Sequence, residues 1–174
     1  MTAPAPLLQL AGSWSGTDQL WFEADQLANE SDITAVMRPT LGGRALLHEY
    51  RWRFGDEEHH GSMLIVPTDP GHEVALADTF HTGGSIMRLV PSPDPDPEAS
   101  VDVLGSYGGD GEQWGWRIVL HQLDDDHVEL TSWNIAPDGQ ASRAVLSQLV
   151  RAADEMADEM ADDVTGEVVD DTVV

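Results

Sequence analysis

Residues 41–54 read LGGRALLHEYRWRF, and this stretch decides the fold. A Gly-Gly turn precedes a segment in which side chains of two kinds alternate, and alternation with a period of two is typical of a β-strand. One face would carry Arg44, Leu46, His48, Tyr50 and Trp52. The other face would carry Glu49, Arg51 and Arg53. We therefore expect a strand over residues 44–54 whose first face points into the protein.

Similar segments recur along the chain, separated by turns rich in glycine, proline and aspartate. We expect strands over residues 13–24, 31–38, 44–54, 59–67, 73–81, 84–90, 99–107, 113–122, 127–135 and 141–151. Short strands joined by hairpins favour an all-β protein, either a sandwich or an up-and-down antiparallel β-barrel of about ten strands. We favour the barrel, because closure removes edge strands and ten strands leave an interior wide enough for a small ligand.

The two ends of the chain differ from this pattern. Residues 1–11 form a leader with a helical turn near Leu7, residues 12–152 form the barrel domain, and residues 153–174 form an acidic tail that is helical or disordered. The last strand is ambiguous, because Leu146 and Leu149 also fit one helix over residues 142–160. We favour a strand to Arg151 followed by a short helix.

Composition excludes several classes of function. The 174 residues carry a formal net charge of -24, and all the basic residues are arginines. Such a charge disfavours nucleic acid and anionic membrane surfaces as partners. Without cysteine there are no disulfides and no thiolate metal sites. No apolar run reaches the ~20 residues of a membrane span and no signal peptide is evident, so we expect a cytoplasmic protein. The oligomeric state stays open, with a homodimer as one alternative.

The turn motifs resemble those of a known family. Residues 10–16 read LAGSWSG, which resembles the opening of calycin-type barrels. The other motifs are LGGR at 41–44, Tyr50, HG at 60–61, ADTFH at 77–81 and PDG at 137–139. Together they are similar to a bacterial family known as domain of unknown function 1579, over about residues 8–152. The resemblance implies a lipocalin-like barrel and brings no established activity.

A more distant resemblance is to nitrobindin-type barrels, which bind haem and share the Gly-x-Trp-x-Gly opening. Their ligand histidine lies near the end of the barrel sequence. Here residues 142–152 read SRAVLSQLVRA, and no histidine follows His127. We therefore do not expect haem, and the sequence requires no cofactor.

Arg44 is the first candidate site residue. Alternation would point it inward, and a buried guanidinium needs a partner. Asp78, on the same face as Leu76 in its strand, is the best candidate. The two would form a structural pair at the barrel mouth, or the Arg44 guanidinium would bind a carboxylate or other oxygen of a ligand.

The remaining candidates are His48, Tyr50, Trp52, His81 and Trp116. His48 would be a hydrogen-bonded core residue or a polar group in a pocket, and Trp116 would be core or cavity wall. His81 follows Asp78 by three residues, so in a strand the two would face opposite ways and a His–Asp dyad would need a bulge. His59 and His60 would also face opposite ways, so we expect no metal site.

These features favour a binding module that holds a small hydrophobic ligand inside the barrel, with Arg44, His48, Tyr50, Trp52, Asp78, His81 and Trp116 as its site. The alternatives are an enzyme that uses His48 or His81 as a base beside Asp78, a haem-binding barrel, and an interaction protein with a filled core. No catalytic constellation stands out, so the binding module is preferred over an enzyme.

Overall fold

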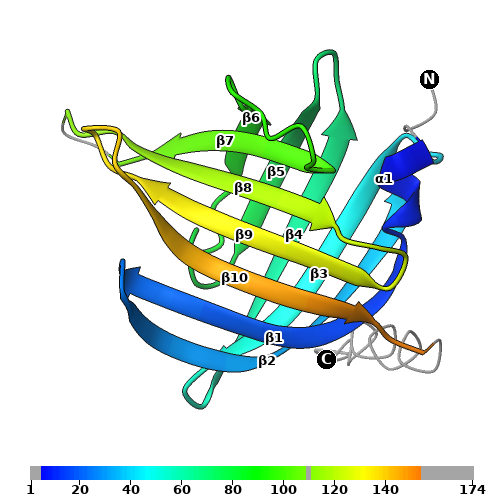
Figure 1. Cartoon of the computed structure of the whole chain (residues 1–174), viewed down its shortest axis with the longest axis horizontal. Helices are drawn as coiled ribbons and strands as arrows, with labels where there is room; N and C mark the ends of the chain where they lie inside the picture. The colour runs from blue at the N-terminus through cyan, green and yellow to red at the C-terminus, as the bar shows by residue number, and fades with distance from the viewer. Residues whose placement is uncertain (1–4, 109–110, 154–174) are drawn as a thin grey trace, which may run out of the picture.

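The computed structural model describes residues 5–108 and 111–153, and in them ten antiparallel strands close into a barrel (Figure 1). The elements are α1 (Ala5–Gln9), β1 (Gly12–Glu23), β2 (Gln26–Thr40), β3 (Ala45–Phe54), β4 (Glu57–Pro67), β5 (His72–Asp78), β6 (Met87–Pro91), β7 (Val101–Tyr107), β8 (Trp114–Gln122), β9 (His127–Ile135) and β10 (Ala141–Arg151). Each strand pairs with its neighbours in the sequence, and β1 pairs with β10 to complete the ring. The predicted all-β, ten-stranded barrel is confirmed.

The seam between β1 and β10 depends on a glycine. Gly16 lies opposite Leu149, and a Cβ atom at Gly16 would come within 1.9 Å of the Gln148 carbonyl oxygen. No other residue has a side chain small enough for this approach. The register Trp14↔Arg151 and Leu20↔Val145 then places the inward-facing residues of both strands in the core.

One end of the barrel is plugged. Helix α1 lies across this end (Figure 1), and Leu7, Leu10 and Trp14 are almost fully buried there. The Trp14 indole Nε1 donates a hydrogen bond to the Leu10 carbonyl oxygen at 3.0 Å, and the Arg151 guanidinium lies 4.3 Å from the Trp14 ring centroid. The plug leaves the opposite end as the way into the interior.

The strand bounds differ from the predicted ones at several points. β2 begins at Gln26 rather than at residue 31, because its polar first half pairs with β1 while facing solvent. β10 is a strand throughout, so the alternative helix over residues 142–160 is wrong as far as Arg151. The predicted acidic tail lies outside the described residues from residue 154 onward. Among the described helices, none is long and apolar enough to cross a membrane.

Candidate functional site

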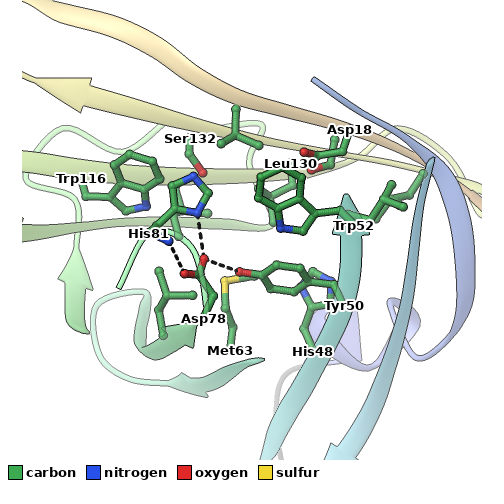
Figure 2. A pocket seen from close by; sticks show the side chains of 16 residues that line it. Asp18, His48, Tyr50, Trp52, Met63, Asp78, His81, Trp116, Leu130 and Ser132 are labelled. Carbon is green, nitrogen blue, oxygen red and sulfur yellow. Dashed lines mark hydrogen bonds and ion pairs between the residues drawn. The ribbon is translucent and has the colours of Figure 1, made fainter. Parts of the chain in front are cut away.

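A chamber lies inside the barrel between the plug and the open end (Figure 2). Its wall is mainly apolar, but polar side chains reach it from five strands and one loop: Asp18 on β1, His48 and Tyr50 on β3, Asp78 on β5, Ser132 on β9, Ser147 on β10 and His81 after β5. The volume open to the centres of water-sized molecules is about 40 Å³. That space holds about three water molecules.

Three residues in one row across the barrel wall position the polar groups. Tyr50 on β3 lies opposite Gly61 on β4, and Gly61 lies opposite Asp78 on β5. The Tyr50 ring lies over Gly61, since a Cβ atom there would come within 2.1 Å of Tyr50 Cζ. The Tyr50 hydroxyl thereby reaches Asp78 Oδ2 at 3.3 Å. The HG motif at 60–61 is thus explained by the space that a tyrosine ring needs.

Asp78 organises the turn that follows β5. Its Oδ1 accepts backbone N–H groups from Phe80, His81 and Thr82, and its Oδ2 lies 2.8 Å from His81 Nδ1. Burial opposes ionisation of Asp78, but the hydrogen bonds and charge of His81 and the backbone N–H groups outweigh it, so its pKa lies below the ordinary value. An ionised Asp78 requires that His81 Nδ1 carry the proton.

This turn corrects the predicted strand over residues 73–81. β5 ends at Asp78, because the carboxylate binds the next backbone N–H groups and so competes with the strand ladder. The His81–Asp78 dyad therefore exists and needs no bulge, since the turn brings His81 back over Asp78. Strand alternation did not apply to a residue outside the strand.

Several buried nitrogen atoms around the chamber lack a hydrogen-bond partner among the described residues. They are both ring nitrogens of His48, Nε2 of His81 and Nε1 of Trp116. His48 is only 2 % exposed, and burial lowers its pKa to about 4, so its ring is neutral at physiological pH. Unpartnered buried polar groups are uncommon in proteins and point to a bound water or ligand.

Asp18 and Ser147 are site residues that the sequence interpretation missed. Asp18 is 3 % exposed, and the Ser147 hydroxyl donates a hydrogen bond to its Oδ1. Burial raises the pKa of Asp18 to about 6, against the opposing effects of the Ser147 hydrogen bond and the charge of His81. Both residues share the parity of inward apolar neighbours, Leu20 on β1 and Leu149 on β10. That parity could have identified them.

Arg44 does not line the chamber, which corrects the prediction that it points inward and pairs with Asp78. The side chain is exposed, and its Nε donates to the Leu41 carbonyl oxygen at 3.0 Å. β3 begins at Ala45, and Leu41 has a positive φ of 51° in the preceding turn. Arg44 therefore belongs to the turn, where the alternation of the strand does not set direction.

The predicted aromatic residues do lie at the chamber wall, and they fix the position of His81. Trp52 is stacked on the His81 ring with centroids 6.0 Å apart, and Trp116 packs on it with centroids 5.1 Å apart. Phe80 packs edge-on against Trp52 at 5.1 Å. The His81 imidazole is thus held by two indoles and by the Asp78 carboxylate.

A second, larger cavity opens at the unplugged end, and we call it the vestibule. Its volume is about 430 Å³, and it shares Leu76, His81 and Trp116 with the chamber. The rim includes Ile86, which is 77 % exposed, and Tyr107, whose hydroxyl donates to Asn134 Oδ1 at 2.6 Å. His81 and Trp116 therefore lie at the boundary between the two cavities.

The described residues hold no cluster of three histidine, aspartate or glutamate side chains that could bind a metal ion. The inward-facing residues of β10 at the chamber are Val145, Ser147 and Leu149, so this strand brings no histidine to it. Candidate chemistry at this site therefore rests on the carboxyl, imidazole, indole and hydroxyl groups already described.

The fold and the site define a closed ten-stranded barrel with an internal chamber. The chain belongs to the family described as Protein of unknown function (DUF1579), which matches residues 4–151. The resemblance seen in the turn motifs is thereby confirmed. No curated protein matches the sequence.

Two solved structures share the fold. Rv2717c from M. tuberculosis superposes with a TM-score of 0.57 at 17 % identity, over 88 % of this chain and 100 % of that one. The S-type phycobiliprotein lyase CPES from Guillardia theta superposes with a TM-score of 0.51 at 15 % identity, over 88 % of this chain and 94 % of that one. At these identities the likeness extends to the fold alone.

Proposed function

We propose that this protein binds a small amphiphilic molecule inside the barrel. The observation that carries the proposal is the pair of adjoining cavities, with buried nitrogens of His81 and Trp116 unpartnered at their shared wall. Each unmade hydrogen bond of this kind costs about 1–3 kcal/mol, which a bound polar group offsets. The vestibule volume lies in the range of small-molecule pockets.

The sizes of the two cavities indicate which part of the ligand each cavity holds. The chamber, at about 40 Å³, accepts only a small polar group, with room for about three water molecules. The apolar body lies in the vestibule, against Leu76, Met87 and Trp116. This proposal refines the predicted hydrophobic ligand, because the polar groups of the chamber favour a molecule with one polar end.

The direct test is binding of N-phenyl-1-naphthylamine, a neutral probe that fluoresces in apolar surroundings. We expect saturable binding, and displacement by octan-1-ol. Ser106→Trp should weaken binding about tenfold or more, because the indole fills the vestibule. Gln148→Trp is the matched control, since it adds the same ring to the exposed outer face of β10. Equal binding by both variants, or no saturable binding to the native chain, contradicts the proposal.

Purification adds a second readout of the same proposal. Native mass spectrometry of the freshly purified chain should reveal an amphiphile that remains bound, and an absorption spectrum reports any chromophore. A Soret band would establish haem in place of the ligand class proposed here.

The His81–Asp78 dyad supports a second candidate function, proton transfer in the same site. Asp78 fixes the Nδ1–H tautomer, so His81 Nε2 has a lone pair available for general-base catalysis. His48 is the weaker candidate, because it has no carboxylate partner and its pKa lies near 4. Turnover of p-nitrophenyl acyl esters that is lost in His81→Gln and kept in His48→Gln would support an enzyme. Unchanged turnover in His81→Gln would exclude His81 as the base.

A further inference from the structure

Asp18 is a buried carboxyl group without an arginine or lysine partner among the residues that line the two cavities. Ser147 donates to Oδ1, and Oδ2 accepts no hydrogen bond from the described residues. The described residues that line the chamber and the vestibule include no arginine and no lysine. A buried carboxylate is costly unless it is paired with an opposite charge or protonated. Asp18 therefore lacks the partner that a buried acid ordinarily has.

Several of the other polar groups around Asp18 offer hydrogen-bond acceptors, beside the Trp116 indole N–H and the Ser132 hydroxyl, which can donate. In a neutral His81 ring, Nε2 carries a lone pair while Nδ1 donates to Asp78, and neutral His48 has one acceptor and one donor nitrogen in either tautomer. The Tyr50 hydroxyl gives its proton to Asp78 and keeps its oxygen lone pairs. Burial and the negative charges of Asp78 and Asp18 raise the pKa of Tyr50, so this hydroxyl stays protonated. The chamber thus offers several acceptors around a small space (Figure 2).

A protonated primary amine fits this arrangement in charge, in hydrogen bonding and in size. It carries one positive charge, three N–H donors and no acceptor. An ammonium group is about the size of a water molecule, and the chamber has room for about three of those. A carboxylate head group would instead face both Asp18 and Asp78. We infer that the ligand carries a protonated amine that enters the chamber and pairs with Asp18.

This inference rests on the proposed amphiphile-binding function and names the class of ligand. The amine occupies the chamber, and its alkyl or aryl body extends past Leu76 and Trp116 into the vestibule, because these residues line both cavities. Ser147 holds the Asp18 carboxyl in place through Oδ1, which leaves Oδ2 for the amine.

The test compares three ligands of one chain length, octan-1-amine, octan-1-ol and octanoate, by displacement of N-phenyl-1-naphthylamine at pH 7.5. We expect the amine to bind about tenfold more tightly than the alcohol, and octanoate to bind most weakly. Asp18→Asn should bring the amine to within about twofold of the alcohol. The matched control is Asp124→Asn, which removes the same charge from an exposed position paired with His127.

The outcomes separate this inference from the proposed function. If the alcohol binds and the amine shows no preference, or if the preference survives Asp18→Asn, the amine inference is overturned and amphiphile binding stands. If none of the three ligands displaces the probe, the proposed function itself fails. If Asp124→Asn removes the preference as strongly as Asp18→Asn, the preference arises from the net charge of the protein and not from a site at Asp18, and the amine inference is overturned.

A pH series on the native chain keeps the inference testable if Asp18→Asn does not fold. The amine preference should fall between pH 7.5 and pH 5 as Asp18 takes up a proton, since the alkylamine itself stays protonated. The titratable groups that face Asp18 are His48, Tyr50, Asp78 and His81. The His81 ring, which is hydrogen-bonded to Asp78, also faces Asp18, so the series is repeated in His81→Gln. A preference that is independent of pH in both proteins overturns the inference.

Discussion

At the scale of single residues, the geometry of the site depends on Gly61. Gly61 has no side chain, so the Tyr50 ring crosses β4 and its hydroxyl reaches Asp78 on the next strand. Asp78 in turn holds His81 by a hydrogen bond to Nδ1. Tyr50, Asp78 and His81 therefore form one hydrogen-bonded network in the chamber wall.

Gly61→Ala tests this network. The new Cβ atom would lie 2.1 Å from Tyr50 Cζ, so the ring must move and the Tyr50–Asp78 bond must break. We expect the free energy of unfolding to fall by about 1–3 kcal/mol, which denaturant titration measures. Ser62→Ala, at the neighbouring and partly exposed position, should change it by less than about 0.5 kcal/mol. Equal stability of Gly61→Ala and the native chain contradicts the packing described here.

Asp18 should also affect how stability depends on pH. Its folded-state pKa of about 6 exceeds the ordinary value of 3.8, so the native carboxyl keeps its proton where the unfolded one has lost it. The stability that the protonated Asp18 contributes is full below about pH 4 and is lost as the pH rises through 6. Across that range, Asp18→Asn should gain stability relative to the native chain by roughly 3 kcal/mol.

Variants are compared because burial of His48 changes the stability of the fold with pH in the opposite direction. Its folded-state pKa of about 4 lies below the ordinary 6.5, so its contribution is present above pH 6.5 and is lost as the pH falls through 4. His48 contributes equally to Asp18→Asn and to the native chain, so its effect cancels in the difference between their free energies of unfolding. A difference that does not change from pH 4 to pH 7 would show that Asp18 is not buried as a charged group.

Single residues also mark the limit of prediction from sequence. Alternation placed His48, Tyr50 and Trp52 at the chamber wall, because they lie well inside β3. It failed for Arg44 and for His81, because both lie in turns where hydrogen bonds to the backbone or to Asp78 set direction. Asp18 was missed, although it shares the parity of the buried Leu20 on β1.

At the scale of elements, hydrophobic alternation predicted strands well and their ends less well. The strand β10 was ambiguous, since Leu146 and Leu149 are three residues apart and fit a helical face, and only pairing with β1 and β9 decides it. The first half of β2 is polar on both faces, so nothing in its sequence distinguishes it from a loop. Such a segment forms a strand because the neighbouring strand pairs with it.

Helix α1 is the element that closes the plugged end of the barrel, and Leu7 is its buried anchor. Leu7→Ala should lower the free energy of unfolding by about 2–5 kcal/mol, because it leaves a cavity at the plugged end. Gln9→Ala, on the exposed face of the same helix, should have little effect. Thermal and denaturant unfolding of the two variants measure the difference. Similar stability of both would show that α1 does not act as a plug.

At the scale of the whole molecule, the barrel has a closed end and an open end. Apolar residues and α1 fill the closed end, and the vestibule at the open end adjoins the chamber through shared wall residues. The number of strands and the barrel were predictable from turn spacing. The volumes of the cavities and the set of polar groups in the chamber were not, because they depend on how side chains from distant strands meet.

The most direct test of binding inside the barrel is a ¹H–¹⁵N NMR titration of the tryptophan indole N–H groups with N-phenyl-1-naphthylamine. The six tryptophans lie at different depths, and Trp116→Phe assigns the resonance at the boundary of the two cavities. We predict a saturable shift of the Trp116 resonance, with Trp14 unchanged in the plug, where its N–H donates to Leu10. Enhanced probe fluorescence with an unmoved Trp116 resonance would place the probe elsewhere and contradict the account.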